Sequence, residues 1–294
     1  MKHRNKYIKY TATSVMYLLG AGFCMASLLG GCTEEMEVSP VVPDGTPVEL
    51  IAEIAGTVQT KAAIPENNYD RSAFVAGDKI LLVKSYGGST AKTDYTFSAG
   101  TTTWTPPSAN NPITLQAGAT YQAVYPSGDP DANYILQNQA TAENFRKSNK
   151  LMSGKITSRD GILKFTGENA FTHQYTKITL TFKVSQGSLS GNLANTLILA
   201  PGLRTGGLME ESITLFRPDA DAYSWCGIVY PKNENTPLSL SLDYGGVTYK
   251  VSLTCGMQPG KHYNYTLTIE NGILVPSVSN IDDWINDIDS GSLT

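Results

Sequence analysis

The chain has 294 residues, and 22 Lys and Arg against 26 Asp and Glu give a formal net charge of −4 at pH 7. It contains no basic stretch with interleaved aromatic residues, so we expect no nucleic acid among its partners. Only 16% of the residues are charged, whereas Gly, Thr, Ser and Tyr are plentiful, which is typical of an exported all-β protein.

The chain begins with the features of an export signal. A basic start is followed by the apolar run Val15–Leu29, which is shorter than the roughly 20 residues of a membrane-spanning helix. Leu29-Gly30-Gly31-Cys32 resembles the lipobox of bacterial lipoproteins, in which the chain is cut just before the cysteine and the thiol is acylated. We therefore expect cleavage between Gly31 and Cys32, with fatty acyl chains such as palmitate on Cys32. The alternative is a plain signal peptide with a chance cysteine.

Composition divides the remainder of the chain into three parts. Residues 32–46 are polar and rich in proline, which predicts a tether between the lipid and the fold. Glu34, Glu35 and Glu37 resemble the signal that sends some lipoproteins to the outer face of the outer membrane, although a solvated linker would look the same. We predict one β-sandwich domain over residues 47–160 and a second over 161–294.

Two cysteines remain beyond the predicted lipid site. Cys226 and Cys255 would lie in a compartment that permits a disulfide, and they could equally be two buried free thiols. Two isolated cysteines do not provide the four ligands of a structural zinc site. The sequence therefore predicts no metal and leaves the disulfide open.

Short alternating runs separated by turn residues predict many strands and almost no helix. One clear run is Tyr175–Val184, which places Ile178 and other apolar residues on one face and Lys177 with other polar residues on the opposite face. A short helix is predicted around Glu143–Lys147. The other predicted strands are Val48–Ile54, Lys79–Val83, Tyr95–Phe97, Thr103–Thr105, Tyr121–Tyr125, Ile162–Phe165, Thr196–Leu199, Ser212–Phe216, Trp225–Tyr230, Leu238–Tyr244, Val247–Thr254 and Tyr263–Ile269.

No arrangement of residues calls for catalysis. The predicted mature chain holds two histidines, His173 and His262, and an isolated histidine in a β domain is usually structural. Gly187-Ser188-Leu189-Ser190-Gly191 has leucine where a nucleophile elbow needs serine. We expect neither enzymatic activity nor a cofactor.

Several local patterns, in this order along the chain, resemble the fimbrillin family, the subunits of type V pili. The resemblance covers nearly the whole predicted mature chain. Its residues are Thr60-Lys61-Ala62, Phe74 to Ile80, Tyr125-Pro126-Ser127-Gly128, Leu151-Met152-Ser153-Gly154, Leu163-Lys164-Phe165, His173 to Leu180, Pro259 to Leu267 and Ile281-Asp282-Asp283-Trp284.

The resemblance implies two transthyretin-like β-sandwich domains in tandem and an assembly mechanism. In that family a trypsin-like protease removes the first strand of an outer-membrane lipoprotein, and a strand from another pilus subunit fills the groove. Here the resemblance places the cut between Lys61 and Ala62, with Arg71 as the alternative, and removes Val48–Ile54. The donor would be Gly272–Ile288. Many relatives have arginine where this chain has Lys61.

A second function, from a different class, is a monomeric surface lipoprotein that binds a glycan or a ligand on a host or bacterial surface. Tyr86, Tyr95, Trp104 and Trp225 would stack on sugar rings if they were exposed. Aromatic residues also dominate the cores of β-sandwiches, so core packing is the simpler interpretation of the same four residues.

Overall fold

The computed structural model describes most of the chain beyond the predicted signal and tether. Contacts divide the chain into two units, Met1–Ser39 and Pro40–Thr294, and all described residues lie in the second. The described residues are 42–56, 70, 73–98, 103–106, 111–187, 189, 194–220, 222–233, 236–254 and 256–284, with only the backbone described for 194–196. The predicted lipid site Cys32 and the predicted cut after Lys61 lie outside these ranges.

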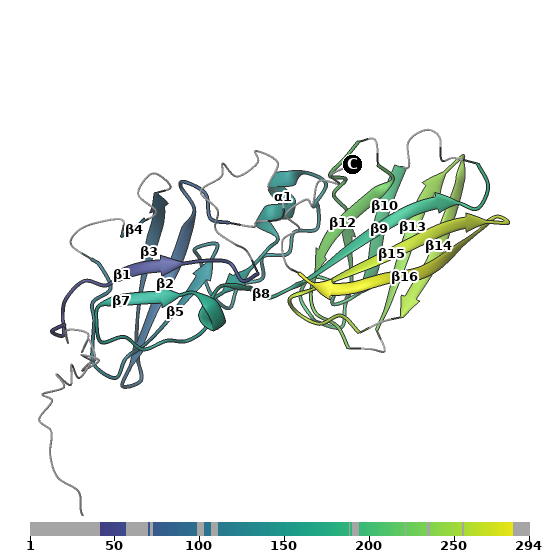
Figure 1. Ribbon diagram of the computed structural model, residues 1–294. Helices are drawn as coiled ribbons and strands as arrows, with labels where there is room; N and C mark the ends of the chain where they lie inside the picture. The colour runs from purple at the N-terminus through teal and green to yellow at the C-terminus, as the bar shows by residue number, and fades with distance from the viewer. Residues whose placement is uncertain are drawn as a thin grey trace, which may run out of the picture. The chain divides into compact units, whose positions relative to one another are not determined.

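The fold is all-β, which confirms the predicted class (Figure 1). The first half of the described chain forms a six-stranded sheet in the order β4-β3-β2-β5-β6-β8 and a separate two-stranded sheet of β1 and β7. The bounds are β1 Glu49–Ala52, β2 Lys79–Tyr86, β3 Ser89–Ser98, β4 Thr103–Thr105, β5 Thr120–Tyr125, β6 Leu151–Met152, β7 Ile162–Phe165 and β8 Thr172–His173.

The second half forms two four-stranded sheets, in the orders β11-β10-β13-β14 and β12-β9-β15-β16. The bounds are β9 Thr176–Val184, β10 Ala194–Pro201, β11 Glu210–Thr214, β12 Ser224–Val229, β13 Pro237–Tyr244, β14 Val247–Thr254, β15 Lys261–Glu270 and β16 Ile273–Asp283. Two short helices, α1 (Ala142–Lys147) and the 3-10 helix η1 (Gly167–Asn169), complete the described elements. No helix in the described part of the chain is long and apolar enough to cross a membrane.

The β13–β14 hairpin shows how local chemistry determines a turn here. Tyr244 pairs with Val247, which leaves Gly245 and Gly246 as the two-residue loop. Their φ angles are +61° and +77°, a left-handed conformation that other residues adopt only with strain. A glycine pair between alternating runs is therefore a specific hairpin signal, and this predicted hairpin is present.

The buried side chains form two clusters, and the chain passes between them more than once. Leu163 and Phe165 of β7 belong to the cluster of the first half, although they follow the predicted domain boundary at Gly161. Ile135 and Phe145, which precede that boundary, belong to the cluster of the second half. The division at Gly161 and the tandem transthyretin-like arrangement remain predictions.

Candidate functional site

The first strand contributes directly to a hydrophobic core. Val48, Leu50, Ala52 and Ile54 are all buried, with exposed fractions between 1% and 7%, whereas the intervening Ile51 is 48% exposed. Side chains alternate across a strand, so one face of this segment packs inward and the other faces solvent. The expectation of a buried first strand at Val48–Ile54 is confirmed, with regular pairing at β1.

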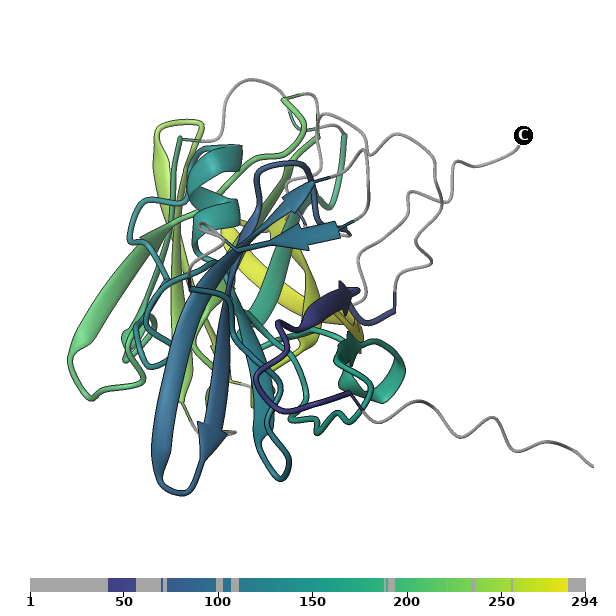
Figure 2. The ribbon, with the colours of Figure 1, turned by 90° about the vertical axis from the view of Figure 1, so that its left-hand side faces the viewer.

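Among the described strands, β1 pairs with β7. β1 and β7 run parallel, with Leu50 opposite Leu163 and Ala52 opposite Phe165 (Figure 1). On the other side, the N–H of Val48 donates to the carbonyl of Ile113 at 3.0 Å. In Figure 2 the purple β1 lies apart from the blue β2–β3 hairpin, and the two belong to different sheets.

Removal of this strand would strongly destabilise the first half of the molecule. Fully burying a Val, Leu or Ile side chain contributes about 1.5–3 kcal/mol, and the segment Val48–Ile54 contains three such buried residues. Their sum approaches the free energy of unfolding of an ordinary domain, about 5–15 kcal/mol. Removal of this segment would therefore expose other apolar side chains of the same cluster, such as Leu163 and Phe165, to water.

The C-terminal strand β16 buries few of its side chains, in contrast to β1. β16 forms an antiparallel pair with β15 and is an edge strand of its sheet. Val278 and Ile281 lie opposite the buried Tyr265 and Tyr263 and so belong to the core-facing side, yet they are 56% and 53% exposed. Of residues 273–284, only Leu274 and Trp284 are buried. The strand is held mainly by its ladder with β15.

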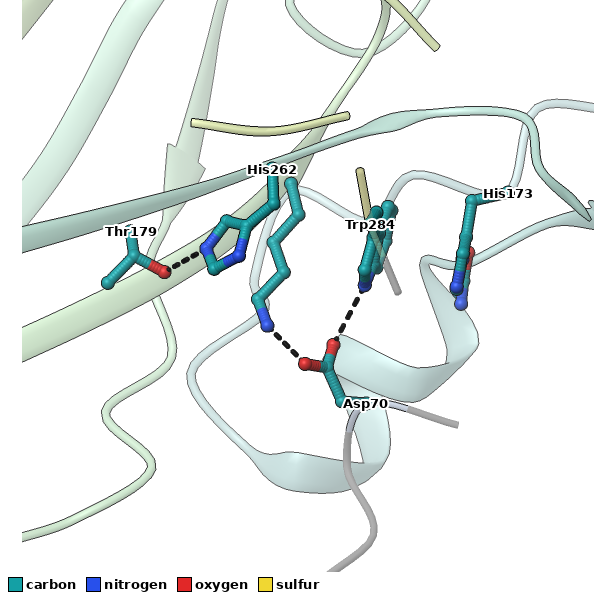
Figure 3. Close-up of polar contacts among 7 residues, drawn as sticks. Asp70, His173, Thr179, His262 and Trp284 are labelled. Carbon is teal, nitrogen blue, oxygen red and sulfur yellow. Dashed lines mark hydrogen bonds and ion pairs between the residues drawn. The ribbon is translucent and has the colours of Figure 1, made fainter. Parts of the chain in front are cut away.

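A polar cluster surrounds Trp284, just after β16 (Figure 3). Asp70 forms an ion pair with Lys177 at the start of β9 and accepts a hydrogen bond from the indole N–H of Trp284 at 3.1 Å. The indole stacks on the ring of His173, with 3.8 Å between centroids and 7° between planes. Removing one partner of a buried ion pair typically costs about 3–5 kcal/mol, because the other charge stays buried without compensation.

Sequence reasoning missed this cluster. The alternation of β9 places Lys177 on the polar face, but its side chain is only 5% exposed. No local pattern links Lys177 to Asp70, which is more than one hundred positions away. The sequence around Lys177 therefore offered no signal that its side chain is buried.

Both histidines are buried and hydrogen-bonded, which is the structural role expected of them. His173 Nδ1 lies 3.1 Å from Asn149 Oδ1, and His262 Nε2 lies 2.7 Å from Thr179 Oγ1. Burial, and secondarily the charge of Lys177, lower the pKa of His262 from 6.5 to about 3. His262 lies opposite Lys177 on β9 and Asp282 on β16.

We expect acid to destabilise the protein through His262. Between about pH 6.5 and pH 3 the unfolded chain binds a proton at this position that the folded chain does not. The contribution of His262 is complete above pH 6.5 and is lost as the pH falls, by up to about 1.4 kcal/mol per pH unit. Urea denaturation at several pH values should show a shallower acid dependence in His262→Gln. Equal slopes in the two proteins would contradict the assignment.

The aromatic residues that motivated the glycan-binding alternative are mostly in the core. Tyr95, Trp104 and Trp225 are buried, and only Tyr86 is exposed. The phenol of Tyr95 accepts a hydrogen bond from the amide of Ile113, which fixes its position inside the first cluster. Three of the four residues are therefore not placed to stack on a sugar.

The remaining predicted sites are described only in part. Cys226 is a buried thiol on β12 with no disulfide partner among the described residues, and burial raises the pKa of this thiol. Cys255 lies outside the described residues, as do Gly31, Cys32, Lys61, Ala62 and Arg71, so the disulfide stays open and the other assignments remain predictions. Among the described residues, no group of His, Cys, Asp and Glu side chains could hold a metal ion.

Comparison with known proteins identifies the class. The sequence profile of the fimbrillin-like family matches residues 60–284. The chain belongs to the fimbrillin-like family, which supports a role as a pilus subunit or adhesin at the cell surface. No curated protein sequence matches the chain.

Solved structures share the fold. A proposed cell adhesion protein of Bacteroides uniformis ATCC 8492 is 18% identical over 81% of this chain and 98% of its own, with a TM-score of 0.59. A second, from Bacteroides ovatus ATCC 8483, is 17% identical over 82% of this chain and 98% of its own, with a TM-score of 0.58. At these identities the likeness concerns the fold alone.

Proposed function

We propose that the protein is a structural pilus subunit that polymerises by strand exchange. It is exported as a lipoprotein, anchored to the outer membrane through Cys32, and activated when proteolysis removes β1. A strand of another subunit then occupies the groove, and the resulting fibre supports adhesion. The burial of four alternating side chains in the segment Val48–Ile54, which includes β1, is the observation that carries this proposal.

The physics of strand addition supports the acceptor half of the mechanism. Loss of β1 exposes apolar side chains such as Leu163 and Phe165 together with the free edge of β7. A strand with apolar residues at alternate positions restores both the ladder and the packing. Each buried backbone group left without a partner costs about 1–3 kcal/mol. Binding of a replacement strand that restores these hydrogen bonds is therefore favourable.

The described residues around Arg71 favour Lys61 as the processing site. A protease binds several extended residues on each side of the bond that it cuts. Asp70 is held in its ion pair with Lys177, and Phe74 is buried among aromatic rings of the first core. Cleavage after Arg71 would require both residues to leave these contacts. A cut after Lys61 does not require Asp70 or Phe74 to leave these contacts.

The properties of β16 support the donor half. Its core-facing residues Leu274, Pro276 and Val278 are apolar at alternate positions, as are those of β1. Because β16 is an edge strand with mostly exposed side chains, detaching it removes few of its own side chains from the core. Pro276 lacks a backbone donor, which limits pairing at that one position.

Limited trypsin digestion followed by size-exclusion chromatography tests the proposal. The protein lacking residues 1–32 should be monomeric before digestion, and after a cut at Lys61 it should form a ladder of oligomers. An excess of a peptide spanning residues 47–55 should suppress the ladder by refilling the groove. Lys61→Ala is the matched control and should remain monomeric. A digested protein that begins at Ala62 and stays monomeric would refute strand exchange.

Anchoring depends on one thiol in this proposal. Cys32→Ala should abolish lipidation, because no other residue at the predicted cut can carry the thioether. We expect an uncut or soluble precursor and no labelled fatty acid on the protein. Incorporation of radiolabelled palmitate into Cys32→Ala at the level of the unaltered protein would show that the lipobox assignment is wrong.

A further inference from the structure

Asp70 joins two parts of the chain that the proposed mechanism treats separately. In sequence it lies between the removable β1 and β2. In space its carboxylate contacts Lys177 with one oxygen and Trp284 with the other (Figure 3). Trp284 immediately follows β16, the proposed donor strand. One side chain thus connects the segment after the removable strand to the end of the donor strand.

Trp284 is the buried attachment at the far end of β16, next to the exposed ion pair between Lys261 and Asp283. Three contacts hold it: the stack on His173, the bond from its indole N–H to Asp70, and the bond from its backbone N–H to the carbonyl of Gly260 at 2.7 Å. The preceding residues 275–283 are exposed. At the other end of the strand, Leu274 is the one buried side chain.

We propose that Asp70 is a latch that keeps the C-terminal strand β16 docked by accepting the hydrogen bond of Trp284. Lys177 holds the carboxylate in place, because the buried ammonium and Asp70 neutralise each other. The geometry makes Asp70 a positioning residue for the donor strand. Its meaning for assembly rests on the proposed strand exchange, whereas the latch itself is a property of the unprocessed monomer.

Cleavage after Lys61 and cleavage after Arg71 would affect the latch differently. Cleavage after Lys61 leaves Asp70 on the subunit, so β1 can depart while β16 stays docked until an acceptor groove competes for it. Cleavage after Arg71 places β1 and Asp70 on the same removed peptide, so the groove and the donor strand would be freed together. A subunit processed at Lys61 is therefore protected from premature release of its donor.

Hydrogen–deuterium exchange on the unprocessed monomer tests the latch without any assembly step. A Lys177→Met background removes the buried ammonium, so that no variant carries an unpaired buried charge. In this background Asp70→Asn keeps an acceptor oxygen for Trp284, and Asp70→Ala removes it. We expect β16 amides to exchange about tenfold faster in Asp70→Ala than in Asp70→Asn, because a buried indole N–H then lacks its partner.

Two controls separate a latch from general destabilisation. Asp44→Ala removes a carboxylate that accepts a bond from the Ala117 amide in the first half of the chain, and β16 exchange should not change. Trp284→Phe keeps the ring for stacking but not the N–H, and should accelerate β16 exchange in the otherwise unaltered protein. Amides of the β13–β14 hairpin serve as the internal reference.

The outcomes are distinct. Faster exchange confined to β16 in Asp70→Ala and Trp284→Phe supports the latch. Equal β16 exchange in Asp70→Ala and Asp70→Asn would overturn it, as would acceleration of equal size in the β13–β14 hairpin. A failed latch leaves the trypsin ladder intact, whereas failed strand exchange abolishes the ladder and leaves this exchange pattern unchanged.

Discussion

Locking β1 in place should stop fibre assembly in a reversible manner. Ile51 and Lys164 are register partners on the exposed side of the β1–β7 pair. Neighbouring strands lie about 4.8 Å apart, within the Cα separation that disulfides accept. The double variant Ile51→Cys/Lys164→Cys, in a Cys255→Ser background without Cys32, should form a disulfide that retains β1 after proteolysis. We expect no oligomers under oxidising conditions and normal oligomers after reduction.

A matched disulfide elsewhere shows whether the effect is specific. Ser239 and Ser252 are exposed register partners in the β13–β14 hairpin, which the mechanism does not open. Ser239→Cys/Ser252→Cys should assemble equally well with and without reductant. Size-exclusion chromatography after trypsin treatment compares the two variants. If the oxidised β1–β7 variant assembled like its reduced form, departure of β1 would not be part of assembly.

Deleting β16 should remove the donor while leaving the acceptor. A chain that ends at Gly272 loses two buried side chains, Leu274 and Trp284, and retains every other described strand. After proteolysis this subunit should not polymerise alone. It should still accept a strand from an intact subunit, and so cap growing fibres and shorten them when mixed with the full-length protein.

Fibre length as a function of the mixing ratio measures this capping. Electron microscopy should show progressively shorter fibres as the truncated subunit is added. The same truncation combined with Lys61→Ala provides the control, because its groove stays filled by β1 and it should not shorten fibres. Unchanged fibre length with the processed truncated subunit, shown to be folded by its thermal transition, would place the donor strand elsewhere.

Much of the local structure could be predicted because its causes are local. Residues Val247–Thr254 were predicted as a strand and form β14 with the same bounds, because alternation and a glycine pair lie next to each other in the sequence. The helix predicted around Glu143 is present, with the Thr141 side chain accepting from the amide of Asn144 at its start. β6 and β8 were missed because two-residue strands have no measurable period.

The non-local features could not be predicted in the same way. Alternation in β1 shows which face is buried, but it does not identify β7, more than one hundred residues later, as the parallel partner. Likewise, nothing near Lys177 shows that Asp70 neutralises it, so alternation alone placed this buried lysine on the polar face. The assembly mechanism itself came from the family resemblance, and the structure adds the burial and pairing that make it physically reasonable.

The most direct test of the account is the N-terminal sequence of subunits isolated from purified fibres. Strand exchange after processing predicts a start at Ala62, which means that β1 is absent from the assembled subunit. Mass spectrometry of the intact subunit should agree and should show no peptide from residues 48–54. Fibre subunits that begin at Cys32, with β1 still attached, would contradict the central claim that the first strand is exchanged.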